Sequence, residues 1–273
     1  GRAAGGAGQV GDVLRSHLGG IGAGLRAACA LPGRQQADEL AELRDDVAAG
    51  ALPARALDQV ADGGGCRLGD QLLVDFSSIE PAATRDFAAR LQLQCGMHWV
   101  DAPVSGGVGG AESGKLVIMA GGDAADVERL RPVAAALSQR LTRMGPVGCG
   151  QVTKVCNQLI VAANAMLIAE AVALAQQSGV DASLLAPALA GGFADSLPLQ
   201  ILAPRMADEH FEPVQWKVAT LLKDLDNAVK LARETGNSTP LAGLANQLMR
   251  LHAAGDNAQR DLSSVIELYR HAH

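Results

Sequence analysis

The sequence predicts an α/β protein: a mainly parallel sheet domain, abbreviated at its N-terminus, followed by an all-α domain. Between residues 71 and 137, short apolar runs typical of strands alternate with helical segments, which is the pattern of a mainly parallel sheet. From residue 150 onward no convincing strand pattern occurs, and apolar residues recur at helical spacing. Residues 1–66 are rich in Ala, Gly and Arg and carry only weak strand signals, so this end of the sheet is expected to be short.

Each element can be placed in order. Strands are expected at residues 71–76, 97–100 and 116–120, and helices at 81–93 and 124–137. Six further helices are expected at residues 150–179, 182–190, 196–206, 216–235, 239–254 and 260–271. Gly179 and Gly236 stand where helix C-terminal stops are typical. The glycine-rich break at 145–150 predicts the boundary between a dinucleotide-binding domain, residues 1–147, and a helical domain, residues 148–273.

Composition excludes several classes of function. The net charge of −6 gives no reason to expect nucleic acid or an anionic membrane as a partner. The five cysteines are odd in number and lack metal-binding spacing, which predicts reduced thiols in a cytoplasmic protein with no metal site. The apolar stretch at 159–174 contains Asn164 and Glu170 and is too short and polar to span a bilayer.

A glycine-rich turn follows the strand at 97–100. Ser105, Gly106 and Gly107 lie just past its end, where α/β sheets place their ligands. Glycines let backbone N–H groups approach an anion closely, and the serine adds a hydroxyl, so a small carboxylate or phosphate fits. A glycine-rich hairpin without a ligand is an equally good interpretation of this turn alone.

A second group of polar residues begins the long helix at 150–179. Lys154 and Asn157 are three residues apart and therefore share one helix face. A lysine becomes an effective proton donor near neutral pH when burial or a neighbouring charge lowers its pKa. Taken alone, Lys154 is better explained as a lysine whose charge reaches solvent at a helix start.

Three segments in this order, residues 101–114, 148–158 and 223–225, resemble the β-hydroxyacid dehydrogenase family, which includes the 3-hydroxyisobutyrate dehydrogenases. The resemblance extends over residues 71–273. Within the family, Asn157 followed by Gln158, together with the segment 191–196, is more similar to the tartronate semialdehyde (2-hydroxy-3-oxopropionate) reductase subgroup. The resemblance implies a Rossmann-type first domain and hydride transfer between a nicotinamide and a short hydroxy acid or semialdehyde.

The same resemblance implies roles for individual residues. Lys154 would donate the proton to the nascent alkoxide. The residues expected to bind the substrate are Ser105, Gly106, Gly107, Asn157, Gln158 and Lys223. Ser78 would lie on the nicotinamide side. The family also implies a homodimer or homotetramer in which the helix at 150–179 packs against a partner.

The sequence carries only a weak signal for the cofactor-binding site. Gly6, Gly8 and Gly11 match the dinucleotide fingerprint, but no apolar strand precedes them, and a rival match begins at Gly22. Arg34 follows a possible strand at residues 25–31 and would suit a 2′-phosphate, although a solvated arginine at a helix start explains it equally well. The resemblance adds Leu52 with Pro53 as a remnant of a cofactor-contacting loop. NAD and NADP both remain open.

Three rival functions remain beside tartronate semialdehyde reduction. The first is 3-hydroxyisobutyrate dehydrogenase or another short hydroxy-acid enzyme of the same family. The second is a non-catalytic nucleotide-binding scaffold, which the abbreviated N-terminus favours and the retained Lys154 opposes. The third is imine reduction on a similar fold.

Overall fold

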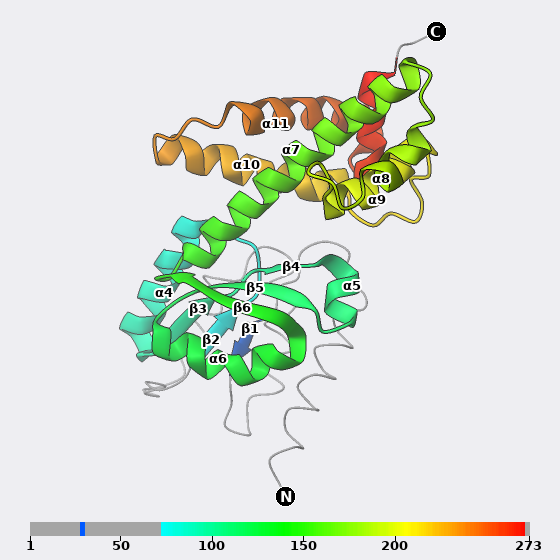
Figure 1. Ribbon diagram of the computed structural model, residues 1–273. Helices are drawn as coiled ribbons and strands as arrows, with labels where there is room; N and C mark the ends of the chain where they lie inside the picture. Colours follow the sequence, from blue (N-terminus) through cyan, green and yellow to red (C-terminus); the bar gives the residue numbers. More distant parts are fainter. Residues whose placement is uncertain (1–27, 31–71, 271–273) are drawn as a thin grey trace, which may run out of the picture. The chain divides into compact units, whose positions relative to one another are not determined.

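The computed structural model describes residues 28–30 and 72–270 (Figure 1). The chain forms two compact units, residues 1–154 and 155–273. The domain boundary between residues 147 and 148 stays a prediction. The six residues predicted to bind the cofactor before residue 71 lie outside the described part: Gly6, Gly8, Gly11, Arg34, Leu52 and Pro53.

Unit 1 is built on one sheet (Figure 1). Its strands are β1 (Ala28–Ala30), β2 (Leu72–Asp75), β3 (His98–Asp101), β4 (Val104–Ser105), β5 (Leu116–Gly121) and β6 (Ser138–Gly145). They run in the order β1-β2-β3-β5-β4, and β6 also pairs with β5. The pairs β2–β3 and β5–β6 are parallel, whereas β1–β2, β3–β5 and β4–β5 are antiparallel.

The described sheet contains antiparallel pairs, but its two longest pairings, β2–β3 and β5–β6, are parallel, as the prediction of a mainly parallel sheet requires. The antiparallel return of β5 follows from what lies in the connection between β3 and β5. This connection holds only the two-residue strand β4 and the six-residue helix α5 (Gly107–Glu112). Parallel neighbours are usually joined through a helix that crosses the sheet, and α5 is too short for this, so β5 returns antiparallel to β3. The broader prediction, an α/β domain followed by an all-helical one, is confirmed.

Helices α4 (Pro81–Cys95) and α6 (Ala124–Leu137) cover opposite faces of the sheet. Successive side chains along a strand point to opposite faces. On β2, Val74 belongs to the buried cluster that includes the apolar side chains of α6. The preceding Leu73 packs instead into the cluster that contains α4. The central strands are thus packed between α4 and α6, so a polar ligand can reach the sheet only at the strand ends and loops.

The described residues of unit 2, 155–270, form helices joined by turns, with an isolated bridge between Lys217 and Asp261. After the long helix α7 (Cys149–Gln177) come η1 (Ala182–Leu184), α8 (Leu185–Leu189), α9 (Leu197–Ala207), α10 (Val218–Glu234), α11 (Pro240–His252), η2 (Ala253–Asn257) and η3 (Leu262–Tyr269). Helices α10 and α11 run side by side (Figure 1). Helix α7 is long and apolar enough to cross a membrane, but Ala162, Ala165 and Ala169 of it are fully buried in the core of unit 2, so it is a core helix.

Candidate active site

The site in unit 1 begins where β2 and β3 end. These strands are adjacent and parallel, so their carboxyl ends lie at one edge of the sheet, where α/β proteins bind ligands. Asp75 ends β2, and its side chain accepts the N–H of Ser77 at 2.9 Å. Ser78, expected on the nicotinamide side, is half-buried in the same loop. Asp101 ends β3 and is fully buried.

Asp101 binds the start of α7. Its two carboxylate oxygens accept the backbone N–H groups of Gly148 at 2.7 Å and Gln151 at 2.8 Å. The first N–H groups of a helix have no partner inside the helix, so this carboxylate caps α7 from another part of the chain. Burial raises the pKa of Asp101 above its ordinary value, the two N–H groups oppose that rise, and Asp75 adds to it.

Gln151 makes a second connection from the same turn. Its side chain is fully buried. The amide nitrogen Nε2 donates to the carbonyl oxygen of Ser77 at 2.9 Å, and Oε1 accepts the N–H of Ile79 at 3.2 Å. One side chain therefore satisfies both a donor and an acceptor in the loop that follows β2. Lys154, half-buried, lies three residues further along α7.

The substrate turn predicted from the glycines is not a plain loop. Ser105 ends β4, Gly106 precedes α5, and Gly107 is the first residue of α5. Gly106 has a φ of 127°, a conformation that only glycine adopts without strain. Both glycines are exposed, so their backbone is accessible to a small molecule.

In unit 2, the predicted substrate residues are joined in one chain of polar contacts. Asn157 Nδ2 donates to Gln158 Oε1 at 2.8 Å, and Gln158 Nε2 donates to Asp224 Oδ2 at 2.5 Å. Lys223 Nζ lies 3.4 Å from the other oxygen of Asp224. Gln158 and Asp224 are buried, whereas the Lys223 side chain is 51% exposed. The contacts connect α7 with α10 and leave a cationic group at the open end.

The predicted site residues divide between the two units. Ser78, Ser105, Gly106, Gly107 and Lys154 belong to unit 1, and Asn157, Gln158 and Lys223 belong to unit 2. The sequence did not single out three buried polar side chains that organise these groups: Asp101, Gln151 and Asp224. All three stand inside the motifs, but their burial and partners could not be derived from spacing.

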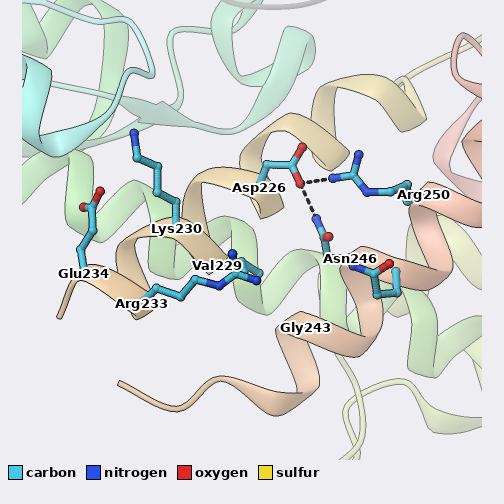
Figure 2. Close-up of a pocket in the computed structure, with 9 residues that line it drawn as sticks. Asp226, Val229, Lys230, Arg233, Glu234, Gly243, Asn246 and Arg250 are labelled. Atoms are coloured by element: carbon cyan, nitrogen blue, oxygen red, sulfur yellow. Dashed lines mark hydrogen bonds and ion pairs between the residues drawn. The ribbon is translucent and has the colours of Figure 1, made fainter. Parts of the chain in front are cut away.

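A separate groove between α10 and α11 contains none of these residues (Figure 2). Within it, Asp226 Oδ1 accepts hydrogen bonds from Asn246 Nδ2 at 2.8 Å and from the Arg250 guanidinium at 2.5 Å. Its carboxylate and these two donors satisfy one another, which is typical of a solvated interhelical contact. Across residues 72–270, no group of His, Cys, Asp and Glu side chains is arranged to hold a metal ion.

Comparison with known proteins identifies the family of the chain. Residues 35–145 match the NAD binding domain of 6-phosphogluconate dehydrogenase, and residues 148–269 match the NAD-binding domain of NADP-dependent 3-hydroxyisobutyrate dehydrogenase. The chain is 38% identical to 2-hydroxy-3-oxopropionate reductase of Escherichia coli K12 over 71% of its own length and 66% of the relative's. It is 35% identical to 3-hydroxyisobutyrate dehydrogenase of Pseudomonas aeruginosa, covering 74% and 70%.

A solved structure gives the same result. The Mycobacterium tuberculosis 3-hydroxyisobutyrate dehydrogenase with L-serine superposes with a TM-score of 0.71 at 31% identity, covering 81% of this chain and 77% of that one. The chain spans about two thirds of the length of the curated relatives named above. The predicted NAD(P)-binding domain is confirmed. The chain belongs to the 3-hydroxyisobutyrate dehydrogenase family of NAD(P)-dependent β-hydroxyacid oxidoreductases.

Proposed function

We propose that this chain reduces a short semialdehyde that carries a carboxylate, with tartronate semialdehyde (2-hydroxy-3-oxopropionate) as the favoured substrate. The observation that carries the proposal is the position of Lys154. It follows directly on the turn of α7 that Asp101 and Gln151 fix at the carboxyl ends of β2 and β3. The subgroup motif around Asn157 and Gln158, and the identity of 38% to a 2-hydroxy-3-oxopropionate reductase, support this substrate.

The described residues fit a nicotinamide cofactor. The loop that holds Ser78 follows the carboxyl end of β2, which pairs in parallel with β3, and this is the edge where nucleotides bind to α/β sheets. When bound, the reduced cofactor supplies the hydride that converts the carbonyl carbon into a hydroxyl carbon. The residues proposed before residue 71 are Gly6, Gly8, Gly11, Arg34, Leu52 and Pro53. The proposed reaction can use either NADH or NADPH as the hydride donor.

The chain's own residues bind the substrate and supply the proton. Ser105, Gly106 and Gly107 hold the carboxylate through a hydroxyl and backbone N–H groups. Lys154 holds a proton at Nζ and gives it to the carbonyl oxygen as negative charge develops there. Asn157, with Gln158 beside it, orients the substrate, and Lys223 adds positive charge toward the carboxylate.

A second candidate is oxidation of 3-hydroxyisobutyrate, favoured by the 35% identity to a 3-hydroxyisobutyrate dehydrogenase over 70% of that relative. The two candidates share the cofactor, the proton donor and the carboxylate. They differ in the groups next to the reacting carbon, so substrate turnover separates them.

The experiment is a substrate panel with the purified chain. Reduced-nicotinamide absorbance is followed with tartronate semialdehyde and methylmalonate semialdehyde, each with NADH and NADPH, and Lys154→Ala serves as the background control. We expect the highest kcat/KM with tartronate semialdehyde. Preference for methylmalonate semialdehyde would support the second candidate. Binding of cofactor without turnover of any substrate would indicate a nucleotide-binding scaffold and overturn the proposal.

We also propose a homodimer or homotetramer in the cytoplasm that uses α7 as an interface. Ile160, Leu167 and Leu174 are spaced seven residues apart on α7 and are 58%, 63% and 67% exposed. This spacing forms one apolar stripe along a helix, as in packed helix pairs. A second copy of the chain is the partner that this stripe suits, because large contiguous apolar patches are rare on monomers.

A further inference from the structure

The first turn of α7 is connected to two separate segments of unit 1 by buried polar side chains. Asp101 reaches it from the end of β3 and binds the N–H groups of Gly148 and Gln151. Gln151 reaches out from it and binds the backbone at Ser77 and Ile79, beyond the end of β2. Both side chains are fully buried, and both polar atoms at the end of each side chain are hydrogen-bonded.

The backbone of this turn also lies directly against the sheet. A Cβ atom on Gly150 would collide with the carbonyl oxygens of Met119 and Asp101. No side chain separates helix from strand at this point, so the helix start cannot slide or rotate without breaking these contacts. The four hydrogen bonds then fix its register, because each has one defined partner atom.

The importance of these hydrogen bonds lies in the segments that they join, the first turn of α7 and the loop after β2. An apolar core would hold a helix against a sheet equally well, but it would not fix the register of a loop. Gln151 bonds to the loop that holds Ser78, on the side proposed for the nicotinamide. Lys154 lies in the next turn of the same helix. A shift of α7 relative to this loop would therefore move the proposed proton donor relative to the proposed cofactor.

We propose that Gln151, supported by Asp101, is a positioning residue: it fixes the first turn of α7 on the loop after β2 and so sets the place of Lys154. This inference rests on the proposed function. Gln151 itself touches neither substrate nor cofactor. Its loss acts through Lys154, and misplacement of a reacting group by about 1 Å costs about 10²-fold in rate.

The test compares Gln151→Met with a matched control. Methionine has a similar length and is apolar, so it fills the space without either hydrogen bond. Asp126→Asn is the control, because Asp126 is also buried in unit 1 and bonds to His98 and Arg129, away from α7. Measured quantities are kcat, the KM for each substrate, the kinetic isotope effect with deuterated reduced cofactor, and hydrogen exchange of the amides of residues 148–158 by mass spectrometry.

We expect Gln151→Met to lower kcat roughly tenfold or more with little change in cofactor KM, to raise the isotope effect, and to speed amide exchange in the first turns of α7. Asp126→Asn should leave all four at parent values. Gln151→Glu keeps the oxygen for Ile79 and should fall between parent and Gln151→Met, and it replaces the latter if that variant does not fold.

The outcomes separate the two proposals. A parent chain that turns over no substrate overturns the proposed function, and the role of Gln151 with it. An active parent whose Gln151→Met variant keeps parent kcat, or parent exchange rates, overturns this inference alone. Equal losses of kcat in Gln151→Met and Asp126→Asn would also overturn it, because they would trace the effect to general stability.

Discussion

Gly106 shows how one residue type can be required by backbone geometry. Its φ of 127° lies where a Cβ strains the backbone, yet an added Cβ would find only ordinary contacts, at 3.4 Å from Leu116 Cδ2. Strain of this kind costs about 1–3 kcal/mol. Substitution therefore changes the turn through its backbone conformation and not through a clash.

For that reason, Gly106→Ala should raise the KM for the semialdehyde about tenfold while the KM for the cofactor stays close to the parent value. Steady-state kinetics with each substrate varied in turn measures both constants. Gly109→Ala is the matched control, because an added Cβ there meets nothing within 4 Å and its φ is outside the strained range. An equal rise in both KM values would assign the turn a structural role only.

The sequence motifs identified candidate site residues but not which polar side chains are buried. The sequence placed Ser105, Gly106 and Lys154 in motifs, but it carried no sign that Gln151 is buried with two backbone partners. Those partners are 72 and 74 residues away in the chain. A buried polar residue is recognised only by the tertiary contacts that satisfy it, and periodicity carries no such information.

Among the elements, the helix at 124–137 was predicted with its observed bounds, because its apolar residues recur at helical spacing and strands flank it. Strand β6 was not predicted. Its sequence is polar and most of its side chains are half-buried or exposed. It is a strand because it pairs with β5, and only the folded sheet supplies that pairing. Helix α5 was also missed, since its three glycines have poor helix propensity.

Helix α11 ends at a buried histidine that should respond to pH. His252 Nε2 lies 2.8 Å from Ser264 Oγ, and both side chains are buried. Burial lowers the pKa of His252, Glu267 opposes this, and Arg260 adds to it. The unfolded chain therefore binds a proton more readily than the folded one. Stability from this residue is present above the unfolded pKa and is lost as the pH falls through and below it.

We expect the Tm of the parent to fall by a few degrees more than that of His252→Gln between about pH 7.5 and about pH 5.5. Thermal melts at both pH values measure this difference. His210→Gln, at an exposed histidine, should behave as the parent. A parent and a His252→Gln variant with the same pH dependence would contradict the assignment.

The exposed stripe on α7 gives a prediction about assembly. Leu167→Glu places a charge in the middle of the stripe, and burying that charge against a second copy would be unfavourable. Light scattering should then report a smaller particle than for the parent. Leu93→Glu, at an 87% exposed position on α4, should leave the mass unchanged. An unchanged mass for Leu167→Glu would remove α7 from the interface.

For the whole molecule, the order of the sequence motifs and the matches to family models point to the same family. The order of the motifs in the sequence is enough to indicate the family, and models of two family domains match residues 35–145 and 148–269. The mixed sheet could not be foreseen, because the direction of a strand depends on the length and path of its connection and not on its own residues. The feature that only the structure reveals is the hydrogen-bonded start of α7, which fixes this helix to the segments at the ends of β2 and β3.

Lys154 is proposed to donate the proton in a hydride-transfer reaction. The most direct test of this role is the kcat for tartronate semialdehyde reduction by the parent and by Lys154→Ala, with cofactor Kd measured by calorimetry on both proteins. We expect an active parent, a loss of about 10² or more in kcat for Lys154→Ala, and a cofactor Kd that stays the same. Near-parent kcat in Lys154→Ala, with the cofactor bound normally, would contradict the proton-donor role of Lys154.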